Sequence, residues 1–170
     1  LVSVNIRESG MYQHVRTIFS ILGISFDDFE PVHLSFEEGG LALERGEIDA
    51  QWQCPIPNPV MSEIADRFDV RVLEYGVGQL EKVIKEAGFY RKAIMRKGAF
   101  SGLKTDTQQV GVLNVIMTHA RVEEKVVRDI VSNMLQGAEL LSEALPLYQG
   151  LNLLFEELKI TGSTTFEPDG

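Results

Sequence analysis

Two short polar stretches of the sequence have residue types that bind small anions. The first is Ser9 followed by Gly10, which stands between an alternating apolar run over residues 1–6 and a helical pattern from Met11 to Leu22. A serine hydroxyl and the free N–H groups of a helix N-terminus suit a carboxylate or a phosphate. The alternative is that Ser9 only caps the helix, and the spacing does not distinguish these two interpretations.

The second polar stretch follows a later strand-like run. The segment GEIDAQWQCPIPNP, residues 46–59, ends in Gln53, Cys54 and a group of prolines. In open α/β sheets, ligands bind beyond the carboxyl ends of the strands, and a proline-rich turn would keep such a rim rigid. We therefore expect Gln53 and Cys54 to line a ligand site. Asn58 is a weaker candidate, because its role as a helix cap before Pro59 is sufficient by itself.

Catalytic and metal chemistry have little support in the sequence. Cys54 could pair with a histidine as a thiol–imidazole couple, but no local motif indicates one, and a buried, inert Cys54 is the simpler interpretation. The three histidines, His14, His33 and His119, do not have the spacing of zinc ligands. We expect no catalytic residue, no metal centre and no cofactor.

The composition is that of a globular protein and excludes several classes of partner. The 170 residues are 44% hydrophobic and 24% charged, which is enough for one well-formed core. The net charge of -9 and the lack of Lys/Arg-rich runs argue against nucleic acid or an anionic membrane surface as a partner. No apolar stretch approaches a membrane span, and a single cysteine cannot form an internal disulfide.

Alternating strand and helix patterns would position the two polar stretches. The first half of the chain predicts strand 1–6, helix 11–22 capped by Ser9, strand 31–35, a helix opened by the capping box of Ser35 and Glu38, a strand before Gln53, a helix from Pro59, and strand 70–76. This order is typical of an α/β sheet with crossover helices.

The second half of the chain is less regular. Its patterns predict helix 77–88, strand 89–96, a glycine-containing loop, a strand over 108–119 that is buried on both faces, a long helix from Val122, and a last helix over 151–158. Glu123 and Glu124 in the first turn of the long helix favour its dipole.

The order of several segments resembles a known family. The segments are VSVNIRESG, ALERGEIDAQWQ, IPNPVMSEIA, VRVLEYG and the stretch from IMRKGAFSGLKTDT to THARVEEKVV. Together they resemble the solute receptors of TRAP transporters of the TAXI subfamily, which are related to type II periplasmic binding proteins. The chain departs from that pattern in reading CPIPNP where the family often has a Gly-Gly-x-Pro run. It also has Phe100 where tyrosine is common, which implies a less polar contact there.

The resemblance implies a protein of two lobes that clamp a ligand between them. Residues 1–112 would form the second α/β lobe, and residues 113–170 would be the return strand and helices of the first lobe, whose N-terminal part would lie upstream of Leu1. Helices that lack their native sheet would expose apolar surface, so we also expect that copies of this chain could associate as a homodimer.

The resemblance also implies a function. The chain would be part of a periplasmic or otherwise extracytoplasmic receptor that captures a small carboxylate or an amino acid for TRAP membrane permease subunits, without being an enzyme. Ser9 and Gly10 would hold the carboxylate, and Gln53, Cys54 and Phe100 would line the rest of the site, with Asn58 as the weaker candidate. Two alternatives stay open: an effector-binding domain of a regulator or sensor, and an enzyme with Cys54 as its nucleophile.

Overall fold

The computed structural model describes residues 1–54, 56, 58–112 and 117–144. The chain divides into two compact units, Leu1–Asn114 and Val115–Gly170. Each unit is described by itself.

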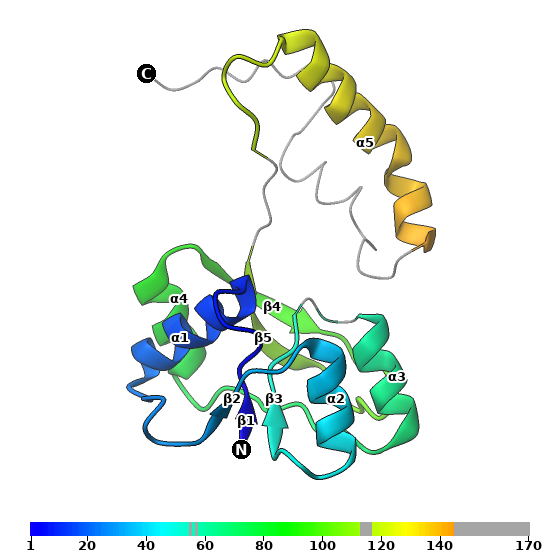
Figure 1. Cartoon of the computed structure of the whole chain (residues 1–170). Helices are drawn as coiled ribbons and strands as arrows, with labels where there is room; N and C mark the ends of the chain where they lie inside the picture. The colour runs from blue at the N-terminus through cyan, green and yellow to red at the C-terminus, as the bar shows by residue number, and fades with distance from the viewer. Residues whose placement is uncertain (55, 57, 113–116, 145–170) are drawn as a thin grey trace. The chain divides into compact units, whose positions relative to one another are not determined.

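A short parallel sheet forms the centre of the first unit (Figure 1). Its strands are β1 (Val2–Ser3), β2 (Pro31–Val32) and β3 (Ala50–Gln51), in the order β2-β1-β3. The backbone bonds continue one residue further, because Val4 N donates to Val32 O at 3.0 Å and Trp52 N donates to Ser3 O at 3.1 Å. Parallel strands joined by helices confirm the predicted α/β fold class.

The three helices of this half begin where the sequence places their caps. Helix α1 spans Gly10–Leu22, α2 spans Phe36–Glu44 and α3 spans Pro59–Arg67. Ser9 and Asn58 each accept a backbone N–H in the first turn, and Ser35 forms both halves of a capping box with Glu38. Gly23, in the left-handed conformation at φ 75°, ends α1.

Figure 1 shows α1 beside α4 on one side of the three strands and α2 beside α3 on the other. Helix α2 approaches its neighbours closely through Gly39 and Gly40. A Cβ on Gly39 would lie 2.4 Å from the Gln51 side-chain nitrogen, and a Cβ on Gly40 would lie 2.0 Å from Ile64 Cδ1. Only glycine leaves the space for this packing.

The rest of the unit consists of α4 (Gln79–Ala87) and an antiparallel pair, β4 (Tyr90–Met95) and β5 (Thr107–Val112). The prediction that the strand after the loop is buried on both faces is wrong for β5. Gln108 is exposed and residues 109–112 are half-buried, because β5 has β4 as its one partner strand among the described residues.

The predicted strand over residues 70–76 is also wrong. Val70 and Val72 are half-buried while Arg71 and Leu73 are exposed, but the alternation ends at Glu74, which is also exposed, and no described strand pairs with this segment. The Leu73 carbonyl accepts instead from the Gln109 side chain at 3.1 Å. Alternation indicates a half-buried extended segment, and a strand also needs a hydrogen-bonded partner in register.

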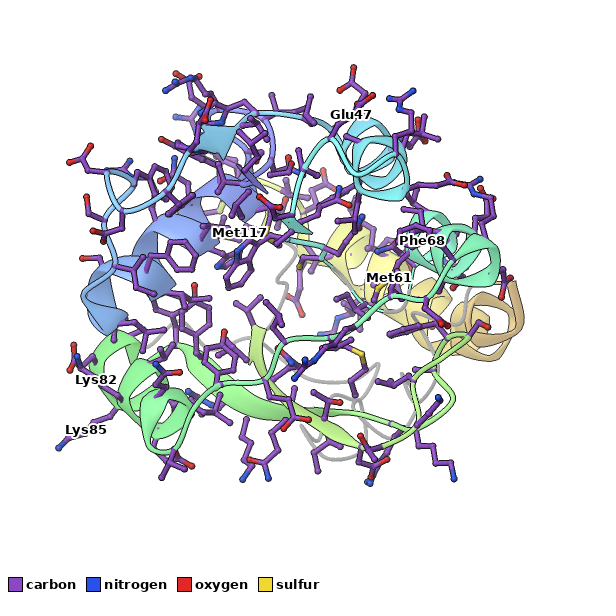
Figure 2. The ribbon with its side chains drawn as sticks, turned by 90° about the horizontal axis from the view of Figure 1, so that it is seen from below. Glu47, Met61, Phe68, Lys82, Lys85 and Met117 are labelled. Carbon is purple, nitrogen blue, oxygen red and sulfur yellow. The ribbon has the colours of Figure 1, made fainter. Side chains whose placement is uncertain are left out.

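Two hydrophobic clusters stabilise the unit. One is built on Ile18, Val83 and Tyr90, with Trp52 and other apolar side chains around them. The other is built on Ala65, Met95 and Phe100, and Met61 of α3 packs against it. By contrast, Figure 2 shows Lys82 and Lys85 projecting outward from α4.

The described part of the second unit contains α5 (Glu124–Ala144), which agrees with the long helix predicted from Val122. Val126 and Ile130 are 45% and 47% exposed. The last predicted helix, over 151–158, lies outside the described residues. Among the described residues, no helix has the length and apolar character that crossing a membrane requires.

Candidate functional site

The first turn of α1 offers two free backbone donors. Ser9 has an extended backbone at φ −67° and ψ 156°, and its Oγ accepts from Tyr12 N at 3.1 Å. Within the described residues, the N–H groups of Gly10 and Met11 have no acceptor. A Cβ built on Gly10 would meet nothing within 4 Å, so this end of the helix is open to an approaching group.

The loop between β1 and α1 has an unusual backbone. Asn5 and Glu8 have φ values of 69° and 67°, in the left-handed region that few residues other than glycine adopt. Asn5 is 6% exposed, its Oδ1 accepts from Ile6 N at 2.8 Å, and its carbonyl accepts from His33 Nδ1 at 3.0 Å. The carboxyl end of β1 is thus tied to the residue that follows β2, a link that no sequence signal indicated.

Gln53 and Asn58, predicted as site residues, meet at the carboxyl end of β3. Asn58 Nδ2 donates to Gln53 Oε1 at 3.3 Å, and Gln53 Nε2 lies 3.5 Å from the Phe36 carbonyl at the start of α2. Asn58 Oδ1 also accepts from Met61 N at 2.9 Å as the cap of α3. Both amides therefore hold the rim together, whether or not they also contact a ligand.

Cys54 lies near a buried tyrosine on the side of the sheet that α1 covers. Burial raises the pKa of the Cys54 thiol, so the thiol stays protonated near neutral pH. A nucleophilic cysteine needs the opposite shift. The structure also engages His14 with another partner, because its Nδ1 lies 2.7 Å from the Tyr90 hydroxyl. These observations argue against a Cys54–His14 nucleophilic pair.

Phe100 lies in the second core cluster, against which Ile56 and Met61 of the segment around Asn58 also pack. It is 6% exposed and forms the second core cluster with Ala65 and Met95. The structure thus gives the Phe100 ring a packing role, and the ligand contact that the resemblance implied for it stays a prediction.

Two hollows of the surface lie away from the predicted residues. A cavity of about 350 Å³ is lined by residues 74–78 and by Leu80, Glu81, Asp106 and Gln108, and a groove of about 260 Å³ lies between α2 and α3. In the part of the chain that the structure describes, no group of three or more His, Cys, Asp or Glu side chains could hold a metal ion.

The first unit is an α/β module in which the N–H groups of Gly10 and Met11, without an acceptor among the described residues, follow the carboxyl end of β1. Residues 1–158 match the NMT1-like family, and the chain belongs to this family. The family is a periplasmic solute-binding family with a binding-protein-like fold, whose members are binding proteins rather than enzymes. The comparison with curated proteins found no match.

Proposed function

We propose that this chain belongs to an extracytoplasmic receptor that captures a small organic anion or an amino acid and passes it to the permease subunits of a TRAP-type transporter. The observation that carries the proposal is the open N-terminus of α1 at the carboxyl edge of the sheet. The N–H groups of Gly10 and Met11 would donate to the ligand carboxylate, and the dipole of the 13-residue helix would favour its negative charge.

The local chemistry accounts for anion binding by an acidic protein. The net charge of -9 disfavours anions at long range. At the N-terminus of α1, however, unpaired N–H groups are within hydrogen-bonding reach of a ligand, and there is no acidic residue in the first turn to oppose it. Short-range, charge-assisted hydrogen bonds are stronger than a screened surface charge several ångströms away.

Closure of two lobes around the ligand would couple capture of the ligand to its delivery to the permease. In this proposal residues 1–112 supply one wall of the cleft and residues 113–170 belong to the opposite lobe. The ligand would stabilise the closed state because it contacts both walls, and the permease would recognise that state. Gln53, Cys54, Asn58 and Phe100 would shape the wall around the carboxylate.

Native mass spectrometry on the gently purified chain tests the proposal. A stoichiometric adduct whose accurate mass fits a small carboxylate or amino acid is expected, and Ser9→Asp should reduce its occupancy by placing a negative charge beside the carboxylate. A Gly137→Ala variant, changed in α5 at a position with open space, is the matched control and should keep the adduct. A bare mass that persists after addition of organic acids and amino acids would contradict the proposal.

A further inference from the structure

Four polar side chains from separate segments lie close together inside the first unit: His14 of α1, Cys54 beyond β3, Tyr75 before α4, and Tyr90 of β4. The Tyr90 hydroxyl and His14 Nδ1 are 2.7 Å apart, and the two rings lie 5.6 Å apart between centroids. Tyr90 is 1% exposed, in the centre of the first core cluster. Burying the Tyr90 hydroxyl would be costly without a hydrogen bond, and His14 supplies that bond.

The hydroxyl and thiol groups of the cluster are neutral at ordinary pH. Burial raises the pKa of Tyr75 to about 12, with a further contribution from Tyr90, and burial also raises the pKa values of Tyr90 and Cys54. A protonated Tyr90 hydroxyl can donate to His14 Nδ1. When the hydroxyl donates in this way, the neutral imidazole carries its hydrogen on Nε2; when the hydroxyl accepts instead, the hydrogen is on Nδ1.

The free nitrogen of His14 is well placed for a ligand. Within the described residues Nε2 has no hydrogen-bond partner, and the His14 side chain is half-buried, so it is open to solvent on one side. His14 lies four residues after Gly10, and residues at this spacing share one face of a helix, about 6 Å apart. Cys54, which follows β3, interacts electrostatically with Tyr90, the partner of His14.

We propose that His14, oriented by Tyr90, is a specificity-determining residue that donates from Nε2 to a neutral acceptor on a small organic acid. The acceptor, such as a keto or hydroxyl oxygen, would lie about one helical turn from the carboxylate at Gly10. Tyr90 is the positioning residue. This inference rests on the proposed function and narrows its ligand class to organic acids that carry a neutral oxygen acceptor about one helical turn from the carboxylate.

Protein-observed NMR titrations of the full chain test this inference with two probes that differ in one group. 4-Oxopentanoate has a keto oxygen on the carbon chain, and pentanoate does not. Both acids should shift the amide resonances of Gly10 and Met11, and 4-oxopentanoate should bind roughly fivefold more tightly, as expected for one neutral hydrogen bond. Its binding should also shift the imidazole resonances of His14.

Variants separate a ligand contact from a structural role. His14→Leu should abolish the preference for 4-oxopentanoate over pentanoate, and His14→Gln should restore part of that preference through the amide N–H. Tyr90→Phe should reduce the preference by releasing His14. If Tyr90→Phe does not fold, the two His14 variants still decide the question.

Three outcomes overturn the inference, and they are distinguishable. Equal affinity for the two acids, with shifts at Gly10, would refute the role of His14 and leave the proposed function standing. A preference that survives in His14→Leu would do the same. The absence of shifts near Gly10 with either acid would count against both this inference and the carboxylate site of the proposed function.

Discussion

The Ser9 hydroxyl can serve the helix and a ligand at the same time. Its oxygen accepts from Tyr12 N at 3.1 Å, which satisfies one donor of the first turn of α1. The hydroxyl hydrogen is still available to a ligand carboxylate, because a serine donates one hydrogen bond while accepting others. The cap and the contact are therefore compatible, and a substitution that keeps one of them can separate their effects.

Two substitutions at Ser9 make that separation. Ser9→Ala should lower the free energy of unfolding by about 1 kcal/mol, because it removes the cap, and should also weaken carboxylate binding. Ser9→Asp should keep the stability, since aspartate caps equally well, but should weaken binding more strongly through charge repulsion. Urea denaturation and isothermal titration measure the two quantities. Equal affinity in wild type and Ser9→Asp would place the carboxylate elsewhere.

The half-buried Tyr75 predicts a loss of stability in alkali. Its pKa is raised from 10.0 to about 12, first by burial and then by Tyr90. The unfolded chain therefore releases this proton at lower pH than the folded chain does, so stability falls as pH rises from about 10 to about 12. Tyr75→Phe should flatten this part of the stability curve, with phenolate absorbance as a direct check. An unchanged slope in Tyr75→Phe would show that Tyr75 titrates normally.

At the scale of elements, the helix starts could be predicted because their signals are local. Ser9, Ser35 and Asn58 each lie within three residues of the N–H groups that they cap, so a short window of sequence contains the whole interaction. Strands depend on partners far along the chain. The segment over 70–76 alternates in burial only from Val70 to Leu73 and has no described partner in register, which the sequence could not reveal.

The glycine pair of α2 leads to a prediction about helix packing. Gly40→Ala should destabilise the first unit by about 1–3 kcal/mol, because the new Cβ would lie 2.0 Å from Ile64 Cδ1 in a buried contact. This cost should exceed the gain of up to about 1 kcal/mol in helix propensity. Ile64→Val in the same chain removes the clashing methyl group and should recover part of the loss. Urea denaturation of the two single variants and the double variant measures this coupling.

Gly137→Ala is the matched control for the gain in helix propensity when glycine is replaced by alanine. Gly137 lies inside α5, and a Cβ there would meet nothing within 4 Å. The substitution should therefore stabilise α5, and the helical signal in circular dichroism measures this change. A Gly40→Ala variant that behaves like Gly137→Ala would contradict the close packing of α2 on α3.

At the scale of the whole molecule, the sequence predicts a ligand site at one edge of the sheet but does not predict the pairing of His14 with Tyr90. His14 and Tyr90 are 76 positions apart, and neither has a motif that points to the other. The sequence favours a solvated surface position for a lone histidine in an amphipathic helix. Only the packing of α1 against α4 and β4 brings the imidazole to the tyrosine hydroxyl. Likewise, the loop containing Phe100 was predicted, whereas the burial of its ring in the second cluster was not.

The division of the chain into two units predicts that the first can fold by itself. The described members of both core clusters precede residue 113, and so do the open end of α1 and the His14–Tyr90 pair. A chain truncated after Asn114 should therefore keep the amide chemical shifts of α1 and of the strands that surround it, measured against the full chain by NMR. It should also keep the carboxylate binding proposed at Gly10, because the donors proposed for it all lie in the first unit.

Val83→Asp in the truncated chain is the control for this experiment. Val83 is 0% exposed in the first cluster, and an unpaired carboxylate there should unfold the unit. The NMR spectrum of this variant is therefore the reference for the unfolded truncated chain. If the truncated chain without this substitution gives the same collapsed amide dispersion, the second unit must supply part of the folding free energy. If it folds but does not bind carboxylates, the prediction that the first unit binds them at Gly10 by itself is wrong.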